Sequence, residues 1–166
     1  MFVSHTILPV FDRNSRVLIL GTIPSPKSRE VNFYYGHPQN RFWKLLGELF
    51  GEDIAKKETE EKREFLLSHK IALWDVLSSC DIKGASDQSI KSAKPNNINL
   101  ILTAAPIKNI FTTGQRADFF YKKLCYPKTK MSAVCLPSPS PANCKTSFEE
   151  LLKQYRAIKS ALRENV

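Results

Sequence analysis

Four short apolar stretches, rich in residues that favour β-structure, are spread along the chain. They are Arg16–Leu20, the weaker Ile71–Val76, Lys108–Thr113 and Ser132–Leu136. Three of them end directly before a glycine or a proline. Continuous apolar runs of this length are typical of strands that are buried on both faces of a sheet. The pattern therefore predicts four buried strands.

Between these stretches, apolar residues recur at the three- and four-residue spacing of an amphipathic helix. Five segments follow this spacing: Phe42–Phe50, Glu58–Lys70, Asn97–Ala105, Gln115–Leu124 and Ser147–Arg163. Two overlapping capping boxes, Thr146-x-x-Glu149 and Ser147-x-x-Glu150, fit the start of the last one. Strands that alternate with helices predict an α/β fold of three layers, α/β/α, around a mostly parallel four-stranded sheet. The site of such a sheet lies at the carboxyl ends of its strands.

The length and the charge of the chain limit the kinds of function that this protein can have. The chain has 166 residues and is 42% hydrophobic, which predicts one folded domain over residues 1–166 and argues against disorder. It carries 25 Lys and Arg against 16 Asp and Glu, a net charge of +9. This excess favours a polyanionic partner, nucleic acid first, although many basic proteins bind none. With no secretory signal and no apolar run of bilayer length, we expect no membrane contact and a cytoplasmic location, or a nuclear one in a eukaryote.

The four cysteines do not have the spacing of a metal site. No C-x-x-C pair is present, and the nearest two are Cys135 and Cys144. We therefore expect reduced thiols, no metal and no cofactor.

A loop of about twenty residues follows the first predicted strand. Loops of that length in compact domains are usually functional or disordered. This one contains Phe33, Tyr34, Tyr35 and His37 beside basic residues, a composition suited to stacking on bases near phosphates. The alternative is that these aromatic side chains pin the loop to the core.

A second loop, Leu136–Asn143, follows the last predicted strand. Three prolines in five residues make it stiff and leave it few backbone donors. The hydroxyls of Ser138 and Ser140 could bind phosphates of a DNA backbone. The alternative is an ordinary rigid connection.

At these loops the sequence resembles the uracil-DNA glycosylase superfamily. Gly21-Thr22-Ile23-Pro24 resembles its first motif, G-x-x-P, and Leu136-Pro137-Ser138-Pro139 its second, H-P-S-P or N-P-S. Asn40-Arg41-Phe42-Trp43 resembles an N-x-F-W element of the thymine and mismatch-uracil enzymes. The longer string Tyr34-Tyr35-Gly36-His37-Pro38-Gln39-Asn40-Arg41-Phe42-Trp43 is most similar to the hypoxanthine (deoxyinosine) branch. The resemblance spans roughly Val17 to Leu162.

Two departures bear on the substrate. Ile23 stands where mismatch-uracil enzymes place an Asn that holds water, and Leu136 replaces the His or Asn of the second motif. Both changes argue against ordinary uracil excision. The hypoxanthine branch implies a catalytic role for Asn40, whose position before a helix also suits an N-cap.

The resemblance implies a glycosylase that binds DNA and flips out a deaminated base. No lysine of the loops is an obvious Schiff-base nucleophile, so we predict a monofunctional enzyme that leaves an abasic site, and for a small repair enzyme we expect a monomer. Asn40 is the candidate catalytic residue. The candidate base pocket is Gly21, Thr22, Ile23, Pro24, Ser25, Phe33, Tyr34, Tyr35 and His37. The candidate DNA contacts are Ser138, Pro139, Ser140, Pro141, Asn143, Lys27 and Arg41. We predict no strong general base. Lys27 is the one lysine of the first loop, and so the one to consider there as a Schiff-base nucleophile.

Three alternatives stay open from the sequence. They are excision of uracil or mismatched pyrimidines, a non-catalytic DNA-binding domain of the same fold, and hydrolysis of free nucleosides or nucleotides. Asp75 and Asp87 are weaker candidates for the site, for which we favour a structural role.

Overall fold

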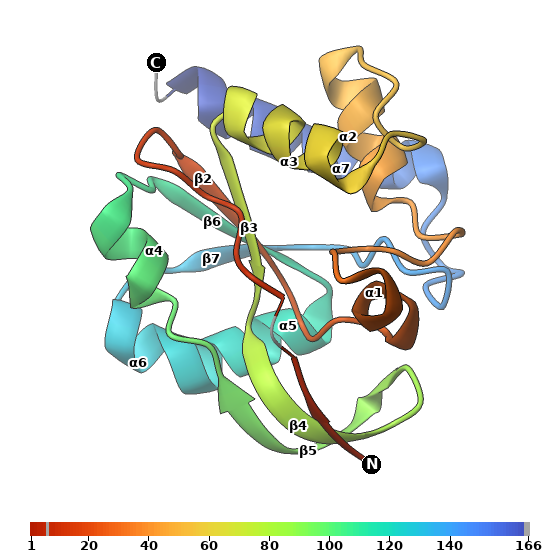
Figure 1. The fold of residues 1–166 in the computed structure, drawn as a ribbon. Coiled ribbons are helices and arrows are strands. Elements are labelled where there is room, and N and C mark those ends of the chain that lie inside the picture. Colours follow the sequence, from red (N-terminus) through yellow and green to blue (C-terminus); the bar gives the residue numbers. More distant parts are fainter. Residues whose placement is uncertain (6, 165–166) are drawn as a thin grey trace.

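A four-stranded parallel sheet forms the centre of the computed structural model, which describes residues 1–5 and 7–164 (Figure 1). The strand order is β3-β2-β6-β7. The bounds are β2 (Val17–Gly21), β3 (Ile71–Asp75), β6 (Asn109–Thr113) and β7 (Ala133–Leu136). All four predicted strands are present, and the predicted fold class is confirmed.

The central strands are apolar because both faces of the sheet are covered. All residues of β2 and β3 are buried. Val17 is paired with Ile71 on one side and with Asn109 on the other. This in-register parallel pairing brings Gly21 beside Asp75 at the carboxyl edge of the sheet.

Helices cover both faces of the sheet. Figure 1 shows α2, α3 and α7 on one face and α4, α5 and α6 on the other. The helices are α1 (Pro26–Val31), α2 (Phe42–Phe50), α3 (Thr59–Ser68), α4 (Asn99–Ala104), α5 (Gln115–Phe120), α6 (Tyr126–Thr129) and α7 (Phe148–Glu164). A π-helical turn, η1 (Tyr121–Cys125), follows α5. The five predicted helices are present, and the predicted helix Gln115–Leu124 spans α5 and most of η1. The short helices α1 and α6 were not predicted.

The hydrogen bonds at the start of α7 show which of the two predicted capping boxes forms. The Ser147 hydroxyl accepts the Glu150 N–H at 3.2 Å. Thr146 instead bonds to Asn143 in the preceding loop. Ser147 is therefore the residue that caps the helix.

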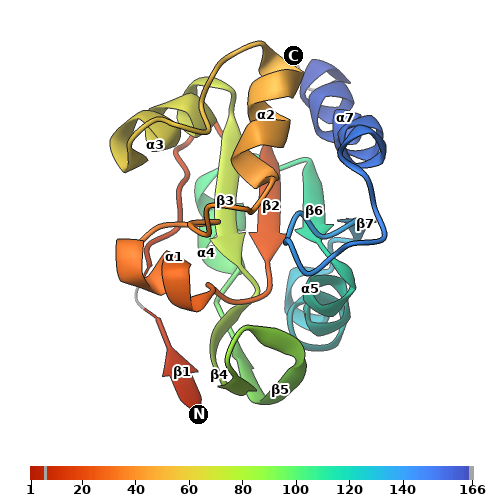
Figure 2. The ribbon, with the colours of Figure 1, turned by 90° about the vertical axis from the view of Figure 1, so that its right-hand side faces the viewer.

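A second sheet, which was not predicted, lies beyond the carboxyl edge of the first. It is antiparallel, in the order β1-β4-β5, with β1 (Phe2–Ser4), β4 (Leu77–Lys83) and β5 (Ser86–Pro95). Only Val76 separates β3 from β4, so the chain passes almost directly from one sheet to the other. Figure 2 shows the β4–β5 hairpin and α1 at the end of the molecule toward which β2 and β3 point. Among the described residues, no helix is long and apolar enough to cross a membrane.

Candidate active site

The carboxyl ends of β2, β3 and β6 bring polar side chains together around Gly21. A Cβ on Gly21 would lie 2.5 Å from Asp75 Oδ1, 3.1 Å from the Tyr35 hydroxyl and 3.7 Å from Thr113 Oγ1. Any side chain at position 21 would displace these groups. The glycine is therefore required by close approach.

Tyr35 reaches this cluster from the first loop. Its hydroxyl lies 2.8 Å from Thr113 Oγ1, and its ring stacks on Phe42 with centroids 3.9 Å apart. Its φ of 52° is left-handed, a conformation that costs a non-glycine residue on the order of 1 kcal/mol. These contacts hold Tyr35 in a conformation that it would otherwise avoid.

The other two aromatic candidates of this loop belong to the core. Phe33 is buried and stacks against Trp43 with centroids 5.8 Å apart. Tyr34 is buried, and its hydroxyl donates to the carbonyl of Leu8 at 2.7 Å. Their burial supports the packing alternative for these two residues, so Tyr35 is the predicted aromatic that lies at the polar cluster.

Two carboxyl groups meet at this end of the sheet. Asp75 is 4% exposed, and burial followed by the nearby Asp87 raises its pKa to about 8. Burial also raises the pKa of Asp87, against a hydrogen bond from Thr22 and the charge of Arg116, which lower it. Asp87 belongs to β5, so its approach to Thr22 depends on a long-range fold contact. The site therefore contains a carboxyl group that is largely neutral near neutral pH.

Asn40 occupies a capping position. Its Oδ1 accepts the N–H of Phe42 at 2.9 Å, and its own N–H donates to the carbonyl of His37. The side chain is half-buried. A carbonyl oxygen has a second lone pair, so this bond leaves Asn40 able to accept from another donor. His37 is exposed, and its Nδ1 accepts the N–H of Gln39.

Arg41 joins the two loops. Its guanidinium donates to the carbonyls of Thr146 at 2.8 Å, Ser140 at 2.9 Å and Asn143 at 2.9 Å. Its backbone N–H donates to the carbonyl of Pro139 at 3.0 Å. We call these four bonds the Arg41 clamp. The clamp fixes the Ser/Pro loop next to Asn40, and it occupies the guanidinium that sequence analysis expected on DNA.

The Ser/Pro loop is further stiffened by its own hydroxyls. Ser138 Oγ accepts the N–H of Ser140, and Ser140 Oγ accepts the N–H of Ala142. Because each hydroxyl oxygen accepts, its O–H remains to donate, and phosphate oxygens only accept. Asn143 is turned inward and donates to the carbonyl of Ser138 at 2.9 Å. Pro139 is buried, whereas Pro141 is exposed.

The start of the first loop is ordered by α1. Ser25 caps this helix by accepting the N–H of Ser28, and Pro24 is buried. Lys27 lies at the surface and pairs with Glu30 at 3.4 Å. Ile23 is half-buried and packs against the core.

Leu136, at the head of the second motif, is 3% exposed. A polar residue at this position would therefore require partners inside the core. Thr113 and Arg116 were not predicted from the sequence, and Asp75 and Asp87 were predicted to have a structural role. An Asp that ends a buried strand at the carboxyl edge was the available signal for Asp75.

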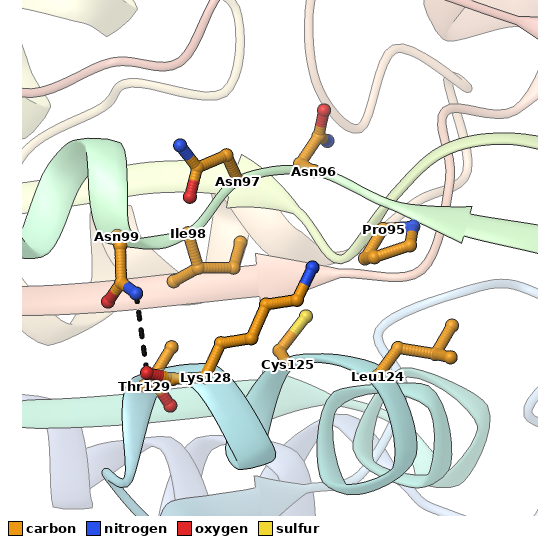
Figure 3. Close-up of a pocket in the computed structure, with 9 residues that line it drawn as sticks. All are labelled: Pro95, Asn96, Asn97, Ile98, Asn99, Leu124, Cys125, Lys128 and Thr129. Atoms are coloured by element: carbon orange, nitrogen blue, oxygen red, sulfur yellow. Dashed lines mark hydrogen bonds between the residues drawn. The ribbon is translucent and has the colours of Figure 1, made fainter.

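A pocket of about 110 Å³ lies away from these groups, between the β5–α4 connection and the η1–α6 segment (Figure 3). Asn99 donates to the carbonyl of Lys128 across it at 3.3 Å. None of the residues predicted from the sequence lines it. Residues 1–5 and 7–164 contain no group of His, Cys, Asp or Glu side chains that could hold a metal ion.

Three comparisons agree on the relationship to known proteins. The family model described as the Uracil DNA glycosylase superfamily matches residues 8–163. A hypoxanthine DNA glycosylase from Methanosarcina barkeri is 37% identical over 66% of this chain and 70% of its own. One from Methanosarcina acetivorans is 33% identical over 81% of this chain and 84% of its own.

The solved structures agree as well. A solution NMR structure from Methanosarcina acetivorans, described as a proposed uracil DNA glycosylase, superposes with a TM-score of 0.83 at 29% identity. The match covers 98% of this chain and 99% of the other. The family model and the structural match each span almost the whole chain. This protein therefore belongs to the uracil DNA glycosylase superfamily.

Proposed function

We propose that this protein is a monofunctional DNA glycosylase that flips a deaminated base out of DNA and hydrolyses its N-glycosidic bond. Hypoxanthine is the proposed main substrate, as in the names of the two Methanosarcina relatives. One observation supports this proposal in addition to the fold. The Arg41 clamp makes the Asn40 segment and the Ser/Pro loop a single unit at the carboxyl edge of the sheet.

The surface features of this unit suit a DNA backbone. The hydroxyls of Ser138 and Ser140, whose oxygens accept within the loop, can donate their O–H to phosphates, and the net charge of +9 attracts the duplex. Lys27 on α1, partly exposed and paired with Glu30, is a further cation of the first loop. We propose that the protein acts as one domain and as a monomer. Because the substrate is DNA, we place it in the cytoplasm of a prokaryote or the nucleus of a eukaryote.

In the proposed reaction, a water oxygen forms a bond to the anomeric carbon of the sugar as the bond from that carbon to the base breaks. The electron pair of the broken bond leaves with the base, which takes up one proton of the water directly or through the solvent, and the other proton stays on the new sugar hydroxyl. Asn40 Oδ1, held by the Phe42 N–H, accepts a hydrogen from this water and orients it. Positive charge develops on the sugar, as in other glycosyl transfers.

Substitution of Asn40 tests the catalytic assignment. Asn40→Ala should lower single-turnover excision of hypoxanthine from a deoxyinosine duplex by about 100-fold, a typical loss for a positioned polar group. DNA affinity should stay within a few fold. Asn14→Ala, an exposed asparagine, is the matched control and should excise normally.

Asn40→Asp keeps the oxygen that accepts the Phe42 N–H, so it keeps the cap and serves as the stability reference for Asn40→Ala. Asn40→Ala should also lose about 1 kcal/mol of stability with the cap, and Asn40→Asp should not. Normal turnover by Asn40→Ala would remove the catalytic assignment and leave Asn40 as a cap.

A further inference from the structure

The strand β7 lies at one edge of the central sheet. It pairs with β6 on one side (Figure 2), and no strand pairs with its other side among residues 1–5 and 7–164. Val134 in this strand is 51% exposed, and Cys135 is exposed as well. A bare strand edge presents unpaired N–H and C=O groups to other chains, and proteins commonly protect it with a charged residue or a proline. The strand Ala133–Leu136 contains neither.

A hollow of about 250 Å³, which we call the β7 hollow, lies beside the start of this strand. Its lining consists of Tyr121, Lys122, Tyr126, Ser132 and Ala133. Alternate side chains of a strand point to the same face of a sheet. A strand that added to β7 would therefore direct alternate side chains to the face on which Ala133 lines the hollow. Two tyrosine side chains and a methyl group suit this hollow to apolar ones.

Exposed aromatic and basic side chains border the β7 hollow. One face of the helical segment formed by α5, η1 and α6 presents Phe119, Lys122, Lys123 and Tyr126, at a spacing of three and four residues. Phe119 is 45% exposed and Tyr126 is 40% exposed. The Lys123 ammonium lies 5.7 Å from the centroid of the Phe119 ring. Single exposed apolar residues are ordinary, but a group of them beside a hollow and a bare strand edge is typical of an interaction site.

The chain around β7 is basic and contains no acid. Residues 119–148 include no Asp or Glu and five lysines, which are Lys122, Lys123, Lys128, Lys130 and Lys145. Lys122 pairs with Asp118 of α5 at 2.8 Å. Lys123, Lys128 and Lys130 form no ion pair with any residue of 1–5 and 7–164. These three ammonium groups are exposed and remain able to bind an anionic partner.

The charge and the bare edge together decide which partner fits. A second copy of this chain would bring an equally basic surface against Lys123 and Lys130, and this repulsion opposes the pairing of two β7 edges. DNA would be attracted by the same lysines, but it has no peptide groups to pair with a strand and no apolar side chain for the hollow. An acidic peptide in an extended conformation complements the edge, the hollow and the lysines at once.

We propose that β7 is the docking site for an acidic, extended segment of another protein, which adds to the central sheet as a further strand. The main chain of that segment pairs with the free N–H and C=O groups of β7, and its alternate apolar side chains enter the β7 hollow. Its carboxylates pair with Lys122, Lys123 and Lys130. Because β7 has four residues, the paired segment is short. This docking site does not depend on the proposed glycosylase reaction.

The test uses a short fluorescent peptide in which glutamate alternates with valine. Fluorescence anisotropy measures its binding to the whole protein at low salt, where charge pairs are least screened. An analogue of the peptide that is methylated on every backbone nitrogen keeps the side chains and the charge but has no N–H to pair. The unmethylated peptide should bind about ten-fold more tightly than this analogue, because the main-chain hydrogen bonds contribute to its affinity.

Three variants test the hollow and the lysines. Ser132→Trp fills the hollow from an exposed position outside β7 and should weaken peptide binding about ten-fold, since a valine side chain is no longer buried there. Lys123→Glu/Lys130→Glu replaces attraction with repulsion and should weaken binding by about the same factor. Lys56→Glu/Lys57→Glu has the same net charge and lies on the exposed connection before α3, which packs on β3 at the opposite edge of the sheet. This control should bind the peptide nearly as tightly as the wild type.

Amide NMR spectra locate the peptide and show that each variant is folded. The peptide should shift the amide resonances of residues 132–135 most. Absence of peptide binding, shifts confined to other segments, equal binding of the methylated analogue, or unchanged binding to a folded Ser132→Trp would each overturn the proposal.

Binding of an undamaged duplex to the two double variants tests the DNA alternative. Because the two variants have the same net charge, they should bind the duplex equally. Much weaker duplex binding by Lys123→Glu/Lys130→Glu would assign these lysines to DNA and would likewise overturn the proposal.

Discussion

The Arg41 clamp predicts a specific, local loss of order when its guanidinium is removed. Three charge-assisted bonds to the carbonyls of Thr146, Ser140 and Asn143 are lost in Arg41→Gln or Arg41→Ala. Such bonds contribute about 1.5–3 kcal/mol each when well shielded. Arg41 is only half-buried, so water replaces part of this energy, and we take the three guanidinium bonds together as about 3 kcal/mol.

A loss of about 3 kcal/mol corresponds to roughly 100-fold more frequent opening of the loop. Hydrogen–deuterium exchange measures this opening at loop amides that the structure protects. The N–H groups of Ser140, Ala142 and Asn143 donate within the loop and should exchange about 100-fold faster in the variant.

Arg156→Gln provides the control, because Arg156 is exposed on α7 and outside the clamp. The Arg41 variants should also excise more slowly, since the loop and Asn40 lose their fixed relation. Unchanged exchange at the three loop amides would show that the clamp contributes no significant energy. Faster exchange with normal excision would separate loop order from activity.

Three further predictions follow from other parts of the structure. Gly21→Ala places a methyl group 2.5 Å from Asp75 Oδ1, so it should abolish most excision in the single-turnover assay. Asp75 has a pKa raised to about 8 in the folded protein, so between about pH 4 and pH 8 the folded state holds a proton that the unfolded state has lost. Its contribution to the free energy of unfolding should therefore fall by up to about 1.4 kcal/mol per pH unit as the pH rises, a slope that Asp75→Asn should remove in urea titrations. Ser147→Ala removes the α7 cap and should cost about 1 kcal/mol, or about 2–4 °C in Tm, whereas the exposed Ser160→Ala should cost little.

Most of the central fold could be predicted from the sequence, because burial on both faces leaves a continuous apolar run. The strand Val17–Gly21 is such a run. The hairpin formed by Leu77–Lys83 and Ser86–Pro95 could not be predicted in this way. Its strands are rich in Ser and Lys, since much of their surface faces solvent, and β-bulges interrupt their pairing. Polar, irregular strands of this kind lack the alternation that marks a half-buried strand.

In the site, too, contacts between neighbours in sequence could be predicted, and contacts between distant segments could not. The cap made by Asn40 and the cap made by Ser25 depend on neighbours in sequence, and α1 could have been predicted from Ser25-Pro26. The bonds from Arg41 to the Ser/Pro loop and the approach of Asp87 to Asp75 join segments far apart in sequence. Such contacts depend on the completed fold, and no local sequence pattern predicts them.

The central claim is tested most directly by single-turnover cleavage of labelled duplexes that contain one deoxyinosine or one deoxyuridine, with alkali to reveal abasic sites. Excision from the deoxyinosine strand, with little or none from the deoxyuridine strand, is the predicted result. Excision of uracil alone would contradict the proposed substrate, and tight DNA binding with no excision of either base would contradict the catalytic function.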